Sequence, residues 1–217
     1  MSVERMLEEG AAGFGVSLSR EDTGKFVRYL EILKAWNRCI NLTALKDDGE
    51  IAVSHFLDSL SAAKFVRGAG SLLDIGSGAG FPGIPLKIAM PELDVTLVES
   101  VHKKTAFMNE VIRELGLTGI RAVWGRAEDE SNGVPRGAFP RVISRAVSGV
   151  KEVLALSEPY LGPGGSIILM RGRRGEEEWE QAGEGVHARY RLVEKMRFTL
   201  PYGGQTRVIF VVEPGPQ

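Results

Sequence analysis

The segment Leu72–Pro85, which reads LLDIGSGAGFPGIP, limits the possible folds of this chain more than any other part of it. Apolar residues flank Asp74, as they do in a short buried parallel strand. Three glycines follow at alternate positions, Gly76, Gly78 and Gly80. They predict a turn that only residues without a Cβ follow closely, and Pro82 and Pro85 suit the first turn of a helix. A strand, a glycine turn and a helix start together predict a site for a nucleotide-like cofactor.

The composition allows one substantial domain and excludes a strongly basic protein. The chain has 217 residues, of which 43% are hydrophobic and 25% charged, and its formal net charge is −1. These values are ordinary for a globular protein. Because the net charge is close to zero, a nucleic-acid site has to be a local patch of basic side chains.

Cysteine and histidine usage argues against disulfide and metal chemistry. Cys39 is the single cysteine, which excludes an internal disulfide and suits a reducing compartment; the helical pattern around it predicts a place in the core. His55, His102 and His187 lack metal-ligand spacing. The charged start MSVERMLEEG lacks the apolar core of a signal peptide, and no apolar run approaches the ~20 residues of a membrane span. We therefore expect a cytoplasmic protein, taken as a monomer, with no metal and no membrane anchor.

The first part of the chain predicts helices. Ser19 and Asp22 form a capping-box pattern. Apolar residues then recur at helical spacing, which predicts a helix over residues 20–39 with one apolar face. A second helix is expected over residues 51–65.

From Gly68-Ala-Gly70 onward the pattern changes to short apolar runs alternating with amphipathic segments, which is typical of βαβ units and a parallel sheet. Five strands are expected, over 72–75, 95–98, 120–124, 142–145 and 166–170. Helices are expected over 102–115 and 148–160, a tight turn at 162–165, and a closing antiparallel hairpin over 198–201 and 206–212. The chain is therefore interpreted as α/β, with an N-terminal helical cap (residues 1–67) and a mostly parallel Rossmann-like domain (residues 68–217).

The glycine turn and an acid on the next strand suggest which cofactor binds. Residues 78–83 spell GAGFPG, the dinucleotide fingerprint G-x-G-x-x-G, which is a weak signal alone. Glu99 ends the next strand, where an acid accepts hydrogen bonds from ribose hydroxyls of NAD or S-adenosylmethionine (SAM) equally well. The first strand follows about 70 residues of helices and about 45 residues remain after the fifth strand, which favours SAM over an NAD enzyme with a separate substrate domain. Asp74 is then placed to hold the SAM ammonium group, directly or through water, and Ala127 and Glu128 to line the adenine.

The residues after the fourth strand narrow the class of methyl acceptor. That position reads Ser144-Arg-Ala146, without the NPPY or DPPY tetrapeptide that binds an exocyclic amino group. The chain also has no Pro-Cys motif, whose cysteine would be the nucleophile in methylation of C5 of a pyrimidine. Arg145 supplies a cation that binds a phosphate, a guanine edge or the cofactor carboxylate. N7 of guanine carries an unshared pair and no proton, so its methylation needs alignment and no general base. The candidate arginines near the strand ends are Arg126, Arg141, Arg145, Arg171, Arg173, Arg174 and Arg207.

Several motifs resemble the RsmG (GidB) family over about residues 26–210. They are Trp36-Asn37 with Ile40-Asn-Leu-Thr43, His55-Phe-Leu-Asp-Ser-Leu60, the segment from Asp74 to Pro85, Glu99-Ser100 with Lys103-Lys104, Gly125-Arg-Ala-Glu128, and Val142-Ile-Ser-Arg-Ala146. The resemblance implies a class I SAM-dependent methyltransferase fold with an N-terminal helical addition. It also implies methylation of N7 of a guanosine in 16S rRNA, guanine 527 in the loop near position 530, and SAM contacts at Gly76, Phe81, Glu99, Ala127, Glu128 and Arg145.

The residue patterns and the family resemblance together predict which residues bind the cofactor, the substrate and RNA. The candidate cofactor-binding residues are Asp74, Gly76, Gly78, Phe81, Glu99, Ser100, Ala127, Glu128 and Arg145. Arg145 and Arg126 are expected to position the substrate, and Arg171, Arg173 and Arg207 to contact RNA. The expected partner is 16S rRNA, in the small ribosomal subunit or its precursor.

The sequence allows more than one interpretation of certain residues and of the function. The family commonly has Lys-Gly after the fifth strand, whereas this chain has Arg171-Gly172, a planar fork in place of a point charge. His55 and Asp58 either border the active site or form a buried structural pair in the cap. Two other functions also remain: a SAM-dependent methyltransferase acting on another RNA atom or a small molecule, and an NAD-binding module.

Overall fold

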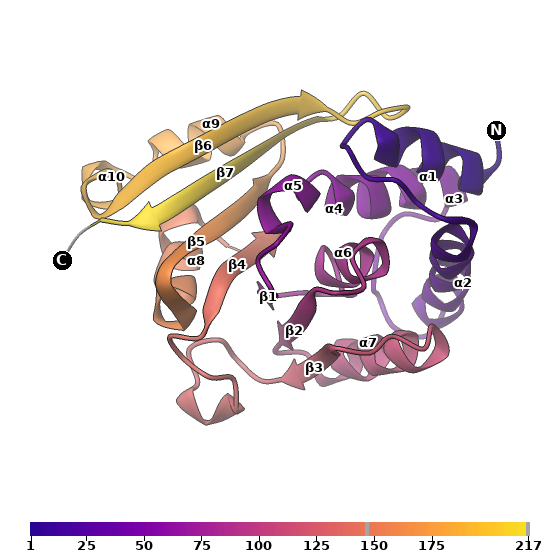
Figure 1. Cartoon of the computed structure of the whole chain (residues 1–217), viewed down its shortest axis with the longest axis horizontal. Helices are drawn as coiled ribbons and strands as arrows, with labels where there is room; N and C mark the ends of the chain where they lie inside the picture. Colours follow the sequence, from indigo (N-terminus) through magenta and orange to yellow (C-terminus); the bar gives the residue numbers. More distant parts are fainter. Residues whose placement is uncertain (146–147, 216–217) are drawn as a thin grey trace.

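The computed structural model describes residues 1–145 and 148–215, and these residues form a seven-stranded sheet with helices on both faces (Figure 1). The strand order is β3-β2-β1-β4-β5-β7-β6. The strands are β1 Ser71–Ile75, β2 Asp94–Glu99, β3 Ile120–Trp124, β4 Phe139–Arg145, β5 Leu161–Arg171, β6 Tyr190–Thr199 and β7 Thr206–Pro214. Strands β1 to β5 are parallel, and β7 runs antiparallel to β5 and β6. Ala146 and the predicted domain's last two residues, 216–217, lie outside the described residues.

The middle strands are apolar on both faces because helices cover both. Leu72 and Leu73, which point to opposite faces of β1, are both fully buried. In the register, Ile75 pairs with Val98 of β2 and Asp74 pairs with Ile143 of β4. The carboxyl ends of β1, β2 and β4 therefore meet at one edge of the sheet, where open α/β folds bind ligands.

The helices form two layers. They are α1 Val3–Ala12, α2 Arg20–Asn37, α3 Asp48–Ile51, the π-helix η1 Ala52–Leu57, α4 Asp58–Leu60, α5 Ala63–Val66, α6 Gly83–Ala89, α7 His102–Glu114, η2 Glu130–Asn132, α8 Val150–Ser157, η3 Glu158–Tyr160, α9 Gly175–Glu180 and α10 Glu184–Arg189. Figure 1 shows α1 to α7 on one side of the sheet and α8 to α10 on the other. The helices of residues 1–67 share one hydrophobic core with α6, α7 and their face of the sheet; the division at residue 67 stays a prediction.

The helical cap differs from the prediction at two places. Helix α2 begins with the expected capping box but ends at Asn37, so Cys39 lies in the following turn and is exposed. The prediction of a core cysteine was therefore wrong, because the helix does not extend far enough to bury it. The single helix expected over 51–65 was also wrong: η1 interrupts it with the i to i+5 bonding of a π-helix.

The remaining strands and helices are close to the predicted ranges, with shifted ends. The segment Gly162–Gly165 belongs to β5 and is not a tight turn; a register shift between Phe139 and Arg141 in the β4–β5 ladder accommodates it. The predicted hairpin is confirmed, with longer strands than expected. The helix expected over 148–160 begins at Val150 and ends in the 3-10 turn η3. Within the described part of the chain, none of the helices has the length and apolarity that crossing a membrane requires.

Candidate active site

The glycine turn between β1 and α6 combines close packing with an open face. Gly78 and Gly80 have φ angles of +60° and +88°, a region that favours glycine. A Cβ on Gly80 would lie 2.4 Å from the Ile84 side chain and 2.8 Å from the Tyr29 hydroxyl, so Gly80 is needed for packing. A Cβ on Gly78 would have only the Gly76 carbonyl near it, at 4.0 Å. Bare backbone at Gly78 therefore faces space that a ligand can occupy.

Glu99, at the end of β2, is fixed against this turn. Its Oε2 accepts a hydrogen bond from the Gly78 N–H at 2.9 Å, and its Oε1 accepts one from the Val101 N–H at 2.8 Å. The residue is only 6% exposed. A carboxylate has about four lone-pair positions, so further acceptor positions remain for the hydroxyls of a ribose. Ser100 follows and is exposed.

Asp74, the last acid before the turn, is completely buried. Its Oδ2 accepts a hydrogen bond from the Gly83 N–H at 2.9 Å, which holds the start of α6. Its Oδ1 has no hydrogen-bond partner among the described residues. Burial raises the pKa of Asp74 to about 7. A buried acceptor without a partner fits a donor group of a bound cofactor, reached directly or through water.

The backbone after β3 is held from the protein interior. The Tyr160 hydroxyl donates to the Ala127 carbonyl at 2.6 Å, and the Asn132 side chain donates to the Arg126 carbonyl at 3.0 Å. Ala127 is buried, whereas Glu128 is exposed and pairs with Arg126 at 3.3 Å. The Arg126 side chain is 75% exposed. The predicted adenine-lining residues thus lie on a fixed turn beside the end of β2.

A hollow lies where the ends of β4, β5 and β7 meet the cap, and we call it the arginine pocket. Its volume is about 400 Å³, and its lining residues are Ser54, His55, Asp58, Arg145, Met170, Arg171, Gly172 and Arg207. The structure therefore brings together three of the predicted substrate-binding arginines, Arg145, Arg171 and Arg207. The other two, Arg126 and Arg173, are exposed on loops outside this lining.

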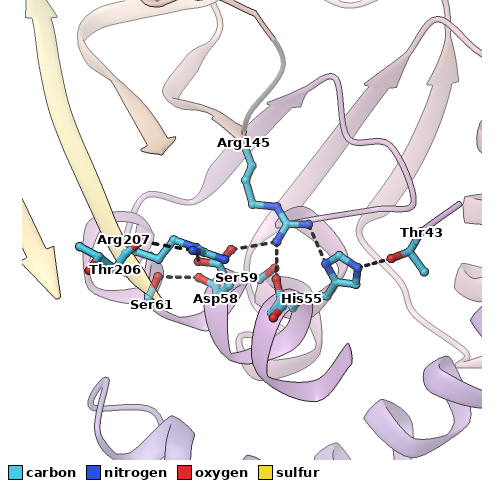
Figure 2. Close-up of polar contacts among 9 residues, drawn as sticks. Thr43, His55, Asp58, Ser59, Ser61, Arg145, Thr206 and Arg207 are labelled. Carbon is cyan, nitrogen blue, oxygen red and sulfur yellow. Dashed lines mark hydrogen bonds and ion pairs between the residues drawn. The ribbon is translucent and has the colours of Figure 1, made fainter. Parts of the chain in front are cut away.

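Asp58 holds two of these arginines (Figure 2). Its Oδ2 accepts from Arg145 Nη1 at 3.0 Å, and its Oδ1 accepts from Arg207 Nε at 3.1 Å. The Asp58 side chain is 5% exposed, so these are buried charge-assisted contacts. Among the described contacts, Asp58 and His55 do not bond to each other; both bind Arg145, so both border the pocket.

His55 continues this network toward the cap (Figure 2). Arg145 Nη2 lies 3.3 Å from His55 Nδ1, and since a guanidinium only donates, Nδ1 is the acceptor. The proton of the neutral ring is then on Nε2, which donates to Thr43 Oγ1 at 2.7 Å. Burial, reinforced by the charge of Arg145, lowers the pKa of His55 to about 3. His55 is therefore neutral at physiological pH.

Asn37 anchors the far end of the same network. Its Oδ1 accepts from the Leu42 and Thr43 N–H groups at 2.8 and 3.0 Å, and its Nδ2 donates to the Thr43 carbonyl at 2.8 Å. The motifs at 36–43 and 55–60 are thus parts of one chain of hydrogen bonds that passes through Arg145. Sequence reasoning did not assign Thr43 to the site, and its only signal was its place in the Asn-Leu-Thr motif.

Phe81 connects the glycine turn to two side chains that line the arginine pocket, His55 and Arg145. The His55 ring stacks on it with 4.7 Å between ring centroids, and the Arg145 guanidinium lies 5.1 Å from its centroid. The Tyr29 ring of α2 stacks on it at 5.5 Å, and the Tyr29 hydroxyl donates to the Ala79 carbonyl of the turn. A ligand on the turn and a ligand in the pocket would therefore be neighbours.

Arg171 is more buried than a surface RNA contact would be. Its side chain is 5% exposed, Nη1 donates to the Ser148 carbonyl at 2.6 Å, and Glu178 lies 3.8 Å away. Its Nε has no hydrogen-bond partner among the described residues. Burial lowers the pKa of Arg171. The guanidinium is thus a fixed positive charge in the pocket wall.

This strand order, a glycine turn after β1 and an acid at the end of β2 define a class I SAM-dependent methyltransferase fold. The chain belongs to the GidB family, rRNA small subunit methyltransferase G, whose sequence model matches residues 22–201. Two relatives named ribosomal RNA small subunit methyltransferase G cover nearly all of the chain. The protein of Geobacter sp. (strain M21) is 43% identical over 212 residues, covering 97% of each chain. The protein of Acetivibrio thermocellus is 39% identical over 218 residues, covering 98% of this chain and 89% of its own. The resemblance and the fold class predicted from the sequence are confirmed.

Solved structures of other methyltransferases share the fold. A ribosomal protein L11 methylase from Lactobacillus delbrueckii subsp. bulgaricus has a TM-score of 0.56 and 14% identity, covering 75% of this chain and 79% of its own. The Bacillus subtilis tRNA methyltransferase TrmK has a TM-score of 0.56 and 16% identity, covering 73% of this chain and 65% of its own. At these identities the likeness concerns the fold alone. In the described ranges no three His, Cys, Asp or Glu side chains are grouped so as to hold a metal ion.

Proposed function

We propose that this protein transfers the methyl group of SAM to N7 of a guanine in 16S rRNA, the target being guanine 527 in the loop near position 530. The observation that carries the proposal is the position of Phe81, a residue of the glycine turn whose ring centroid lies 4.7 Å from the His55 ring and 5.1 Å from the Arg145 guanidinium of the arginine pocket. A base in that pocket would lie beside a methyl donor on the glycine turn. Membership of the rRNA small subunit methyltransferase G family supports the choice of substrate.

The residues around the glycine turn fit SAM. When bound, SAM supplies an electrophilic methyl group on a sulfonium. In this proposal the bare backbone at Gly76 and Gly78 lies against its methionine part, and the buried Oδ1 of Asp74 accepts from its ammonium group directly or through water. Glu99 accepts from the ribose hydroxyls. The adenine lies against Ser100, Ala127 and Glu128, and Arg145 lies close enough to the turn to attract the cofactor carboxylate.

The pocket suits an acceptor that loses no proton. Asp58 is engaged by two arginines, and His55 is neutral with its Nδ1 turned to Arg145, so neither group is ready to take a proton. N7 of guanine needs neither, because its lone pair forms the bond to the methyl carbon while the electrons of the breaking C–S bond return to sulfur. An arginine that donates to guanine O6 orients the base and leaves N7 free to react.

The arginines divide between the target base and the rest of the RNA. Arg145 and Arg207 are presented by Asp58 at the pocket, and we assign Arg145 to positioning the base. The exposed Arg173 and Arg126 then contact RNA phosphates around it, and Arg171 attracts the RNA from the pocket wall through its fixed positive charge. The proposed partner is the small ribosomal subunit or its precursor, met by a monomer in the cytoplasm.

The proposal is tested by mapping the methyl group. The protein is incubated with labelled SAM and unmethylated small-subunit particles or precursors, and N7-methylguanosine is located by reduction and chain cleavage. We expect a single cleavage site, at guanine 527. Label on another RNA atom or on a small molecule contradicts the assignment of N7, and binding of NADH in preference to SAM contradicts the cofactor.

A further inference from the structure

We propose that Trp124 is a stacking platform for an unpaired base of the RNA substrate, outside the pocket that takes the target guanine. Trp124 ends β3 and is 60% exposed, which is unusual for the largest apolar side chain. The inference rests on the function proposed above and adds a second contact to the same RNA.

The indole is exposed but fixed in orientation. Its Nε1 donates to the Ser100 carbonyl at 3.0 Å, and the His102 ring meets it in an edge-to-face pair with 5.0 Å between centroids. The backbone beside it is tied to β2, where Trp124 pairs with Glu99 and the Gly125 N–H donates to the Glu99 carbonyl at 3.0 Å. A ring held in this way loses little further freedom when a base stacks on it.

The two segments next to the indole, the start of α7 and the turn after β3, carry positive side chains. The first turn of α7 carries Lys103 and Lys104 and no acid, although cations are unfavourable at the positive end of a helix dipole. Arg126 follows Trp124 by two residues and is largely exposed, with Glu128 as its ion-pair partner. Departures from the local rules of helix stability are expected at functional sites. An aromatic face beside cations is the arrangement that proteins use to bind single-stranded nucleic acid.

The location favours RNA as the occupant. Strands β3 and β4 are separated by β2 and β1 in the sheet, so the ends of β3 and β4 lie about 14 Å apart. A short run of unpaired nucleotides is long enough to cover this distance from the arginine pocket. The cations Lys103, Lys104 and Arg126 match the phosphates of such a run, and an uncharged protein surface would not need them.

The test uses the fluorescence of the indole itself. Trp36→Phe with Trp179→Phe leaves Trp124 as the single tryptophan of the chain. An unstructured RNA dodecamer, SAM, and RNA-free small-subunit proteins are titrated separately. We expect quenching by the RNA, and about tenfold or greater weakening of RNA binding in Trp124→Ala of the otherwise unaltered chain. Trp124→Phe should recover most of the affinity, and Tyr202→Ala, which removes an aromatic side chain 49% exposed elsewhere, should change nothing.

Each contrary outcome has a distinct meaning. Unchanged RNA affinity in Trp124→Ala overturns the platform. Quenching by SAM with loss of SAM affinity makes the indole a cover for the adenine, and quenching by the proteins alone makes it a protein contact; both overturn the proposal. RNA quenching in a protein that fails to methylate N7 refutes the proposed function and not RNA stacking. Methylation by Trp124→Ala with the wild-type KM refutes the platform and not the function.

Discussion

Asp58→Asn tests the arginine pocket most directly, because one buried carboxylate holds both Arg145 and Arg207. The substitution keeps the volume and one acceptor oxygen but removes the charge, and it leaves two guanidiniums that are only 16% and 21% exposed without a counter-charge. Removing one partner of a buried ion pair costs about 3–5 kcal/mol. Since Asn still accepts one hydrogen bond, we expect the free energy of unfolding to fall by about 3 kcal/mol, the lower end of this range. In a chain of this length that corresponds to a fall in Tm of about 6–12 °C.

Thermal and urea unfolding of Asp58→Asn measure this loss, and methyl transfer to small-subunit particles should fall with it as Arg145 loses its position. The matched control is Asp48→Asn in the same cap, whose partner Lys34 is 43% exposed. An exposed pair contributes about 1 kcal/mol or less, so the control should unfold nearly like the wild type. Equal losses in the two variants would refute the buried network, and full methyl transfer by Asp58→Asn would refute the positioning of Arg145.

Two further substitutions test the cofactor turn and the charge of the pocket histidine. Gly78→Leu should abolish SAM binding, whereas Gly68→Leu, at a similar φ of +73° and with no atom within 4 Å of its Cβ, should pay the same strain of about 1–2 kcal/mol and bind SAM normally. Equal SAM affinities in the two variants, measured by calorimetry, would show that the cofactor does not bind at the glycine turn. The low pKa of His55, about 3, means that its burial favours folding above pH 6.5 and that this contribution is lost as pH falls toward 3. The difference in unfolding free energy between wild type and His55→Gln, measured by urea titration, should therefore grow by up to about 1.4 kcal/mol per pH unit from pH 4 to 6.5. Parallel pH dependences of the two proteins would show that His55 binds its proton equally well in the folded and unfolded states.

Much of the sheet was predictable because its signals are local. The segment around Asp74 carries its strand, turn and helix start in adjacent residues, and β2 and β3 follow in the same order of apolar runs. The position of Glu99 beside the turn also followed, because the carboxyl ends of neighbouring parallel strands meet at one edge.

The cap was less predictable because its geometry departs from regular helix periodicity. A window at 3.6 residues per turn reads residues 51–65 as one helix and does not register the π-helical turns of η1. Those turns set where His55 and Asp58 lie, and the two meet through Arg145 instead of pairing with each other. Contacts of this kind join residues about 90 positions apart, so no local pattern contains them. The prediction that Cys39 is buried was wrong for a simpler reason. The helix ends at Asn37, whose side chain accepts hydrogen bonds from the N–H groups of Leu42 and Thr43 and so stabilises the turn that follows.

The line of hydrogen bonds from Asn37 through Thr43, His55, Arg145 and Asp58 to Arg207 has a consequence for genetics. Mutations that impair the enzyme are expected along most of the gene's length, yet the residues that they change lie together in the folded protein. A cluster map drawn on the primary sequence would miss this grouping, and one drawn on the coordinates would find it.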